Sequence, residues 1–157
     1  MKPRIIFLSK RVLSLHPLSW VSNLIAFFTK SDITHTATVY YRNNVPYVRE
    51  MGFWGVSRMP YENYIKKYEK RIFGIKIIEN FANFEKYNYA CDNYFTRYDY
   101  TSLFMQIIES IFVNFTWKNT EYKRTCSEDS ARMINILNPE FFKNPETETP
   151  VSLYEKL

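Results

Sequence analysis

Three residues of this sequence have the types and settings that nucleophilic chemistry requires: Cys126, His35 and Glu50. A cysteine acts as a nucleophile as its thiolate, with a nearby imidazole that carries protons to and from the reacting groups. A carboxylate that accepts a hydrogen bond from the imidazole holds that ring in a productive orientation. Together, these side chains would cleave an amide or acyl bond through a thioester, provided that folding brings them together.

The residues around Cys126 have the pattern of a helix start. A small or apolar residue recurs at i, i+4, i+7, i+8 and i+11, which forms one face of a helix: Cys126, Ser130, Met133, Ile134 and Leu137. Thr125 and Glu128 have the spacing of a capping box, and Asn138-Pro139 ends the helix. Cys126 is then the first helical residue, where unpaired backbone N–H groups lower the pKa of a thiol. The alternative is a small apolar residue at the edge of a core helix.

The base for this thiol must be one of the two histidines in the chain, and His35 is the better candidate because His16 precedes a proline in a predicted loop. His35 begins a segment that alternates as a strand does and runs to Tyr41. A lone histidine on a strand is otherwise explained as a core residue with its hydrogen bonds satisfied.

Glu50 is brought near His35 by the hairpin that follows. Asn43-Asn44 tolerates positive φ and predicts a two-residue turn before a return strand from Val45 to Met51. With that turn, Ala37 faces Glu50, which places Glu50 one diagonal step from His35, about 7–8 Å away. A register slip of one residue would instead make Glu50 a surface residue.

The rest of the chain predicts an α+β fold, with a small antiparallel sheet packed against helices. We expect strands over residues 4–9 and 71–79, and helices over residues 19–28, 60–70, 80–97 and 102–115. The aromatic stripes of these helices and Cys91, in the middle of one of them, are expected in the core. Residues 51–59 are expected to form a loop, residues 117–124 a polar connection, and the tail after Pro139 an irregular segment.

Composition excludes several classes of protein. We expect one domain spanning residues 1–157, because 46% of the residues are hydrophobic and no repeat or low-complexity run is present. The chain has only three glycines and no glycine-rich phosphate-binding loop. Its two cysteines form neither a disulfide framework nor a Cys/His metal cluster, so no cofactor and no metal are expected. The net charge is +5, but the Lys and Arg residues are interleaved with acidic ones and do not form a basic cluster. No nucleic acid partner is therefore expected. The apolar run over residues 12–28 resembles a signal anchor, but polar residues interrupt it and no cleavage site follows it. A cytoplasmic location is therefore expected.

The ordered motifs resemble the circularly permuted papain-like cysteine amidases, relatives of NlpC-type cell-wall peptidases and of YiiX-like proteins. In that group the order is histidine, acid and then cysteine near the C-terminus, as in His35, Glu50 and Cys126. The matching motifs, over residues 31–137, are H-T-A-T-V-Y-Y, V-R-E-M, Gly55-Val56, a proline-led helix, Tyr98-Asp99-Tyr100 and T-C-S-E. The chain differs in having Ala37 where the family often has glycine. It also has Asp129 and Ser130 after Cys-Ser-Glu, and the two acids there are expected to raise the pKa of the thiol.

The resemblance implies a cysteine hydrolase acting on a cell-wall peptide or a small peptide or isopeptide amide. In this reading Cys126 is the nucleophile, His35 the general acid and base, and Glu50 its orienter. Tyr98 would line the substrate site, or simply pack as other tyrosines do. One alternative uses the same residues for acyl transfer from lipids, as in lecithin:retinol acyltransferase-like proteins, with contact to a membrane surface. Another alternative is a binding module that keeps the scaffold without catalysis. The oligomeric state stays open.

Overall fold

A five-stranded antiparallel sheet forms the centre of the computed structural model, which describes residues 1–11, 23, 26–27, 30–52, 54–79, 81–98, 123–139 and 141–157. The strand order is β4-β3-β2-β1-β5. The strands are β1 (Arg4–Ser9), β2 (Ile33–Arg42), β3 (Val45–Gly52), β4 (Gly55–Pro60) and β5 (Ile72–Ile77). The expected α+β class is confirmed. The predicted helices over residues 19–28 and 102–115 lie outside the described residues, apart from residues 23, 26 and 27, which are helical.

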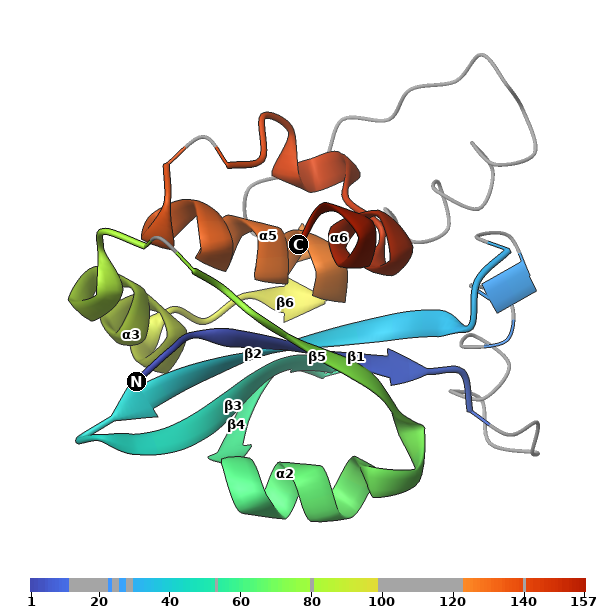
Figure 1. Cartoon of the computed structure of the whole chain (residues 1–157), viewed down its shortest axis with the longest axis horizontal. Helices are drawn as coiled ribbons and strands as arrows, with labels where there is room; N and C mark the ends of the chain where they lie inside the picture. The colour runs from blue at the N-terminus through green and yellow to red at the C-terminus, as the bar shows by residue number, and fades with distance from the viewer. Residues whose placement is uncertain are drawn as a thin grey trace.

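Helices cover both faces of the sheet (Figure 1). One face packs against α3 (Phe84–Asn93), α5 (Cys126–Leu137) and α6 (Pro150–Lys156), and the other packs against α2 (Tyr61–Tyr68). Alternate residues of β1 divide between the two cores, because successive strand side chains point to opposite faces. Ile5 and Phe7 belong to the α5 side, and Ile6 and Leu8 belong to the α2 side.

The β2–β3 hairpin has the predicted register. Asn43 and Asn44 both have positive φ, 49° and 65°, as a two-residue turn of this kind requires. Ala37 pairs with Glu50, as expected, and Arg42 pairs with Val45 next to the turn. The hairpin therefore fixes which face of the sheet carries Glu50.

Two predictions for the middle of the chain are wrong. Residues 51–59 are not a loop, because Gly55–Pro60 forms the edge strand β4, whose backbone pairs with β3 from Gly52–Gly55 onward. The helix expected over residues 80–97 is the shorter α3. Residues 82 and 83 donate their N–H groups to the carbonyl of Leu137 instead of entering a helix. At its other end, the carbonyl of Tyr94 accepts hydrogen bonds from Arg49 and Arg58.

The segments around α5 add short elements that the pattern did not indicate. β6 (Arg97–Tyr98) and β7 (Lys123–Arg124) pair in parallel, and β7 ends two residues before Cys126. After α5 the tail was expected to be irregular, but it forms the 3-10 helix η2 (Pro145–Thr147) and then α6. Thr149 and Ser152 cap α6 reciprocally, and its Leu153 is fully buried. The helix predicted over residues 60–70 is α2 followed by the 3-10 helix η1 (Glu69–Arg71).

Candidate active site

Cys126 is the first residue of α5, as its sequence context predicted. The side chain of Thr125 caps the helix, and its hydroxyl accepts a hydrogen bond from the backbone N–H of Glu128 at 3.3 Å. Asn138 has an extended conformation and ends the helix before Pro139. The sulfur therefore lies at the positive end of the helix dipole, where a negative charge is stabilised.

His35 lies near the start of β2, and its ring is oriented by Glu50. The Nε2 atom of His35 is 2.9 Å from the Oε1 atom of Glu50. Both side chains are largely buried, with 19% of the His35 side chain and 10% of the Glu50 side chain exposed. Cys126 is the second side chain that interacts with the His35 ring.

The Cys126 sulfur lies among three groups that favour its negative charge, the His35 ring and the backbone N–H groups of Thr36 and Ser127. Thr36 lies just beyond the β2–β3 ladder, whose last pair is Ala37–Glu50. Burial alone would raise the pKa of Cys126, but the charge and hydrogen bond of His35 and the two backbone N–H groups lower it.

The pKa of His35 moves in the complementary direction. Burial alone would lower it, but the negative charge of Cys126 and the hydrogen bonds to Cys126 and Glu50 raise it to about 10. A lowered thiol pKa beside a raised imidazole pKa favours transfer of the proton from sulfur to nitrogen. The resulting thiolate–imidazolium pair is the reactive form of a nucleophilic cysteine.

Glu50 has two further partners that the sequence pattern did not identify. The hydroxyl groups of Tyr64 and Tyr68, one turn apart on α2, each lie 3.3 Å from an oxygen of Glu50. Burial would raise the pKa of Glu50, but His35, the charge of Lys67 and the hydrogen bond from Tyr64 lower it. These tyrosines were expected only as core residues. Their i, i+4 spacing on the helix that follows the hairpin was the available signal.

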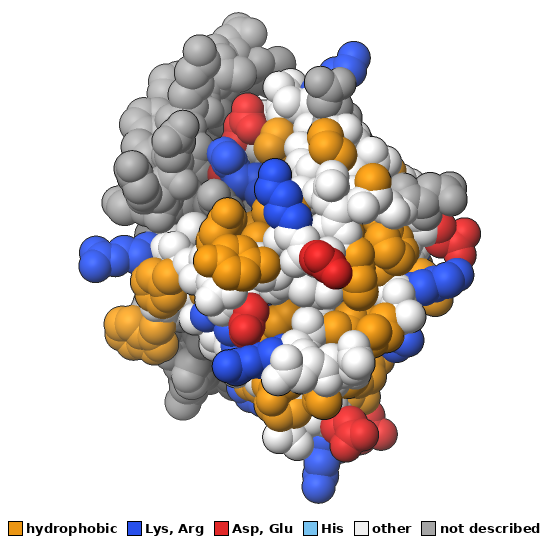
Figure 2. Space-filling model, turned by 90° about the vertical axis from the view of Figure 1, so that its left-hand side faces the viewer, with side chains coloured by type: hydrophobic (Ala, Val, Ile, Leu, Met, Phe, Trp, Pro, Cys, Tyr) orange, Lys and Arg blue, Asp and Glu red, His pale blue; other side chains and the backbone are white. Residues whose placement is uncertain are grey.

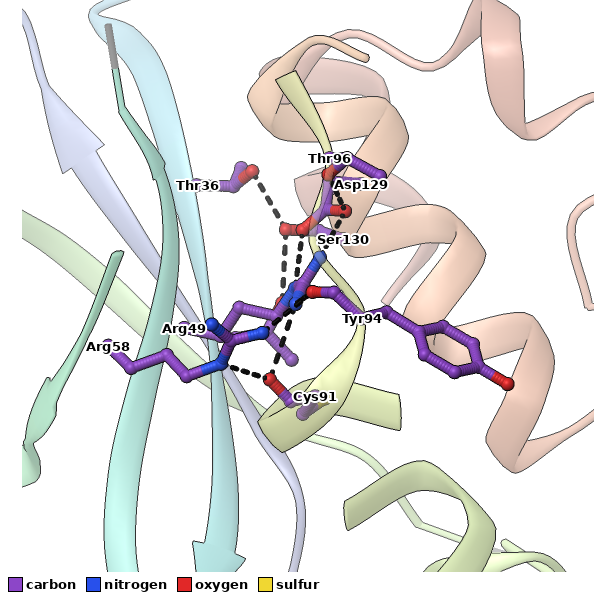
Figure 3. A network of polar contacts seen from close by, with 9 residues as sticks. Thr36, Arg49, Arg58, Cys91, Tyr94, Thr96, Asp129 and Ser130 are labelled. Atoms are coloured by element: carbon purple, nitrogen blue, oxygen red, sulfur yellow. Dashed lines mark hydrogen bonds and ion pairs between the residues drawn. The ribbon is translucent and has the colours of Figure 1, made fainter. Parts of the chain in front are cut away.

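The two acids that follow Cys126 are each paired with an arginine. Glu128 accepts a hydrogen bond from Arg132 at 3.1 Å, and Asp129 forms a two-point contact with Arg49 (Figure 3). Sequence reasoning expected both acids to raise the pKa of the thiol. The pKa of Cys126 is nevertheless lowered. The arginines supply opposite charge next to both carboxylates.

The other candidates occupy different settings. Cys91 lies in α3 with 0% of its surface exposed, and burial raises the pKa of its thiol, which agrees with its predicted place in the core. The backbone of Tyr98 pairs with Arg124 in β7, close in sequence to Cys126, but its side chain lies outside the described residues, as does His16. The structure therefore joins Cys126, His35 and Glu50 in one site.

Three further observations concern the residues that the structure describes. No three His, Cys, Asp or Glu side chains among them are grouped to hold a metal ion. No helix within the described ranges combines the length and the apolar character needed to cross a membrane. On the face drawn in Figure 2, positive and negative side chains alternate among apolar ones, without a large area of one sign.

No protein-family model and no curated protein matches this chain.

Proposed function

We propose that the chain is a cysteine hydrolase that cleaves an amide or peptide bond through a thioester on Cys126. The observation that carries this proposal is the continuous set of contacts from the Cys126 sulfur through His35 to Glu50. A thiolate, an acid–base group and an orienting carboxylate are the three parts that a papain-type centre requires.

The reaction would proceed in two steps. The sulfur of Cys126 attacks the carbonyl carbon, His35 gives its proton to the leaving amine as the C–N bond breaks, and the acyl group stays on sulfur as a thioester. Water then attacks the thioester while its proton passes to His35, and the C–S bond breaks to release the acid and the thiolate. The backbone N–H of Cys126, which lacks an intrahelical acceptor because Cys126 is the first residue of α5, would stabilise the oxyanion of each step.

The permuted papain-like, NlpC-type fold belongs to the same proposal. It is supported by the order His35, Glu50 and Cys126 along the chain and by a capped helix start beside an antiparallel sheet. Cell-wall peptides and small peptide or isopeptide amides are the substrates that this resemblance suggests.

The decisive experiment is to trap the thioester. The protein is incubated with muropeptides, with small peptide and isopeptide amides, and with acyl lipids, then quenched in acid and analysed by intact-mass and peptide mass spectrometry. We expect an acyl adduct on Cys126 with an amide substrate, and none in the Cys126→Ala variant. If an adduct forms only with the acyl lipids, the proposed activity is that of an acyltransferase and not of an amidase.

Thiol labelling separates catalysis from simple binding. Iodoacetamide should modify Cys126 well below pH 8.5 and faster than Cys91, which is the internal control. In the His35→Ala variant this advantage should disappear. Equal and slow labelling of both cysteines in the unmodified protein would reject the hydrolase and favour a binding module.

A further inference from the structure

The first turn of α5 is buried and yet polar. Four consecutive residues are at most 2% exposed: Ser127, Glu128, Asp129 and Ser130. Further along the helix, Met133 and Ile134 pack in the apolar core. Apolar contacts are non-directional and tolerate small shifts, whereas hydrogen bonds to charged groups have narrow ranges of distance and angle. The end of α5 that carries Cys126 is therefore attached to the sheet by directional contacts.

The strongest of these contacts joins Arg49 of β3 to Asp129. The Nε atom of Arg49 is 2.9 Å from Oδ2 of Asp129, and its Nη2 atom is 3.0 Å from Oδ1. The two side chains are 0% and 3% exposed. On the same turn, the Ser130 hydroxyl lies 3.0 Å from the Thr36 hydroxyl (Figure 3). A two-point contact of this kind fixes orientation as well as distance.

The same arginine also reaches the end of α3. Its Nη1 atom donates to the backbone carbonyls of Cys91 and Tyr94, and Arg58 of β4 donates to both of these carbonyls. Figure 3 shows the two guanidinium groups converging on this helix end. The network thus connects the strands β3 and β4, the end of α3 and the beginning of α5.

The ion pair and the candidate active site share one strand and one helical turn. Arg49 immediately precedes Glu50 in β3, and the two side chains point to opposite faces of the sheet. Asp129 follows Cys126 by three residues, a rise of about 4.5 Å along the helix. Two routes therefore lead from β3 to this turn, one through Glu50 and His35 to Cys126, and the other from Arg49 to Asp129. Any slide of α5 that separates the sulfur from the imidazole must also break the two-point contact.

Stability alone does not account for an ion pair at this position. Removing two charges from water costs nearly as much as their attraction returns, and apolar pairs of similar volume are often at least as stable. An apolar pair does not reproduce the fixed geometry. We propose that the Arg49–Asp129 ion pair is a positioning clamp that sets the contact between the Cys126 sulfur and the His35 imidazole. This inference rests on the proposed function, because it concerns the same thiol.

The test measures the rate of Cys126 alkylation by iodoacetamide against pH, with peptide mass spectrometry to separate Cys126 from Cys91. Arg49→Lys keeps the charge but loses the planar two-point contact. The double variant Arg49→Met/Asp129→Leu replaces the ion pair with an apolar pair of similar volume. Arg58→Lys is the matched control, because it weakens the contacts to the end of α3. Circular dichroism and urea unfolding report whether each variant is folded.

We expect the midpoint of alkylation to rise by about one pH unit in Arg49→Lys and in the apolar double variant, which is about tenfold slower labelling at pH values below the midpoint of the unmodified protein. The control should keep the midpoint of the unmodified protein. Folded variants with an unchanged midpoint would overturn the clamp while leaving the proposed function intact. If the unmodified protein itself shows an ordinary midpoint that does not depend on His35, the proposed function fails instead. Should the double variant not fold, Arg49→Lys decides the question.

Discussion

The Nε2 atom of His35 and the Oε1 atom of Glu50 lie 2.9 Å apart, although 15 residues separate them in the chain. The hairpin register accounts for this proximity, since the Ala37–Glu50 pair places Glu50 on the same face as His35. The imidazole is thereby held through its Nε2 atom, and the same ring interacts with Cys126.

Glu50→Gln tests the importance of this orientation. The variant keeps the size of the side chain but loses the negative charge, so the pKa of His35 should fall from about 10. We expect kcat/KM to fall, but by less than in His35→Ala, where the loss of acid–base catalysis should cost about 10²- to 10⁴-fold. NMR titration of the His35 ring measures the pKa, and an unshifted titration would contradict an orienting role for Glu50.

The dependence of stability on pH should reveal the thiolate–imidazolium pair. The pKa of His35 is 6.5 in the unfolded chain and about 10 in the folded one, so its stabilising effect is full below pH 6.5 and is lost as pH rises through 10. The pKa of Cys126 is lowered from 9.0, so its stabilising effect is full above pH 9 and is lost as pH falls through the folded value.

Just below pH 9 the pH dependences of these two effects cancel, because the folded and the unfolded chain each hold one proton on this pair. As the pH rises further, the unfolded chain loses the proton of Cys126 about one pH unit before the folded chain loses that of His35. The free energy of unfolding should therefore fall by about 1.4 kcal/mol in total as the pH rises through 9 and 10. Urea unfolding across this range measures the effect, and the Cys126→Ala/His35→Ala variant supplies the contribution of all other groups. A pair with unshifted pKa values would show no such decrease.

The tyrosines of α2 should contribute modestly to the site. Tyr64→Phe and Tyr68→Phe each remove one hydroxyl contact to Glu50 and keep the aromatic ring in place. A lost hydrogen bond to a carboxylate is worth about 1.5–3 kcal/mol at most, and less at the observed 3.3 Å. We expect each variant to lower the free energy of unfolding by about 1 kcal/mol and kcat/KM by roughly tenfold or less. A loss as large as that of Glu50→Gln would mean that a tyrosine contacts the substrate directly.

Leu153→Ala tests whether the C-terminal helix belongs to the core. Leu153 is fully buried and belongs to the apolar core that also contains residues of α3, α5 and β1. Truncation should lower the free energy of unfolding by about 2–5 kcal/mol, because it removes buried apolar surface and leaves a cavity. Glu155→Ala, at an exposed position of the same helix, is the control and should change it by about 0.5 kcal/mol or less. Equal stability of both variants would place α6 outside the core.

Local features of the sequence were sufficient to predict the start of α5 and the register of the hairpin. The cap at Thr125 and the turn at Asn43-Asn44 depend on residues within a few positions of one another. Those short-range interactions determine that Cys126 begins a helix and that Glu50 shares a face with His35. The sheet strands with strong β-branched or aromatic character were predicted for the same reason.

Only the tertiary structure decided how these elements meet. The edge strand β4 and the short α3 depend on hydrogen bonds to distant partners, and α6 depends on a buried position for Leu153. Arg49 and Asp129 are 80 residues apart, and no local pattern identifies two oppositely charged residues so distant as a buried pair. The contact between His35 and Cys126 spans a similar stretch of chain. The sequence by itself determined that Cys126 begins a helix and that His35 and Glu50 share one face of a hairpin. The packing of α5 on the sheet determined that Cys126 lies beside His35, because only burial and directional contacts between distant segments fix the position of one element relative to another.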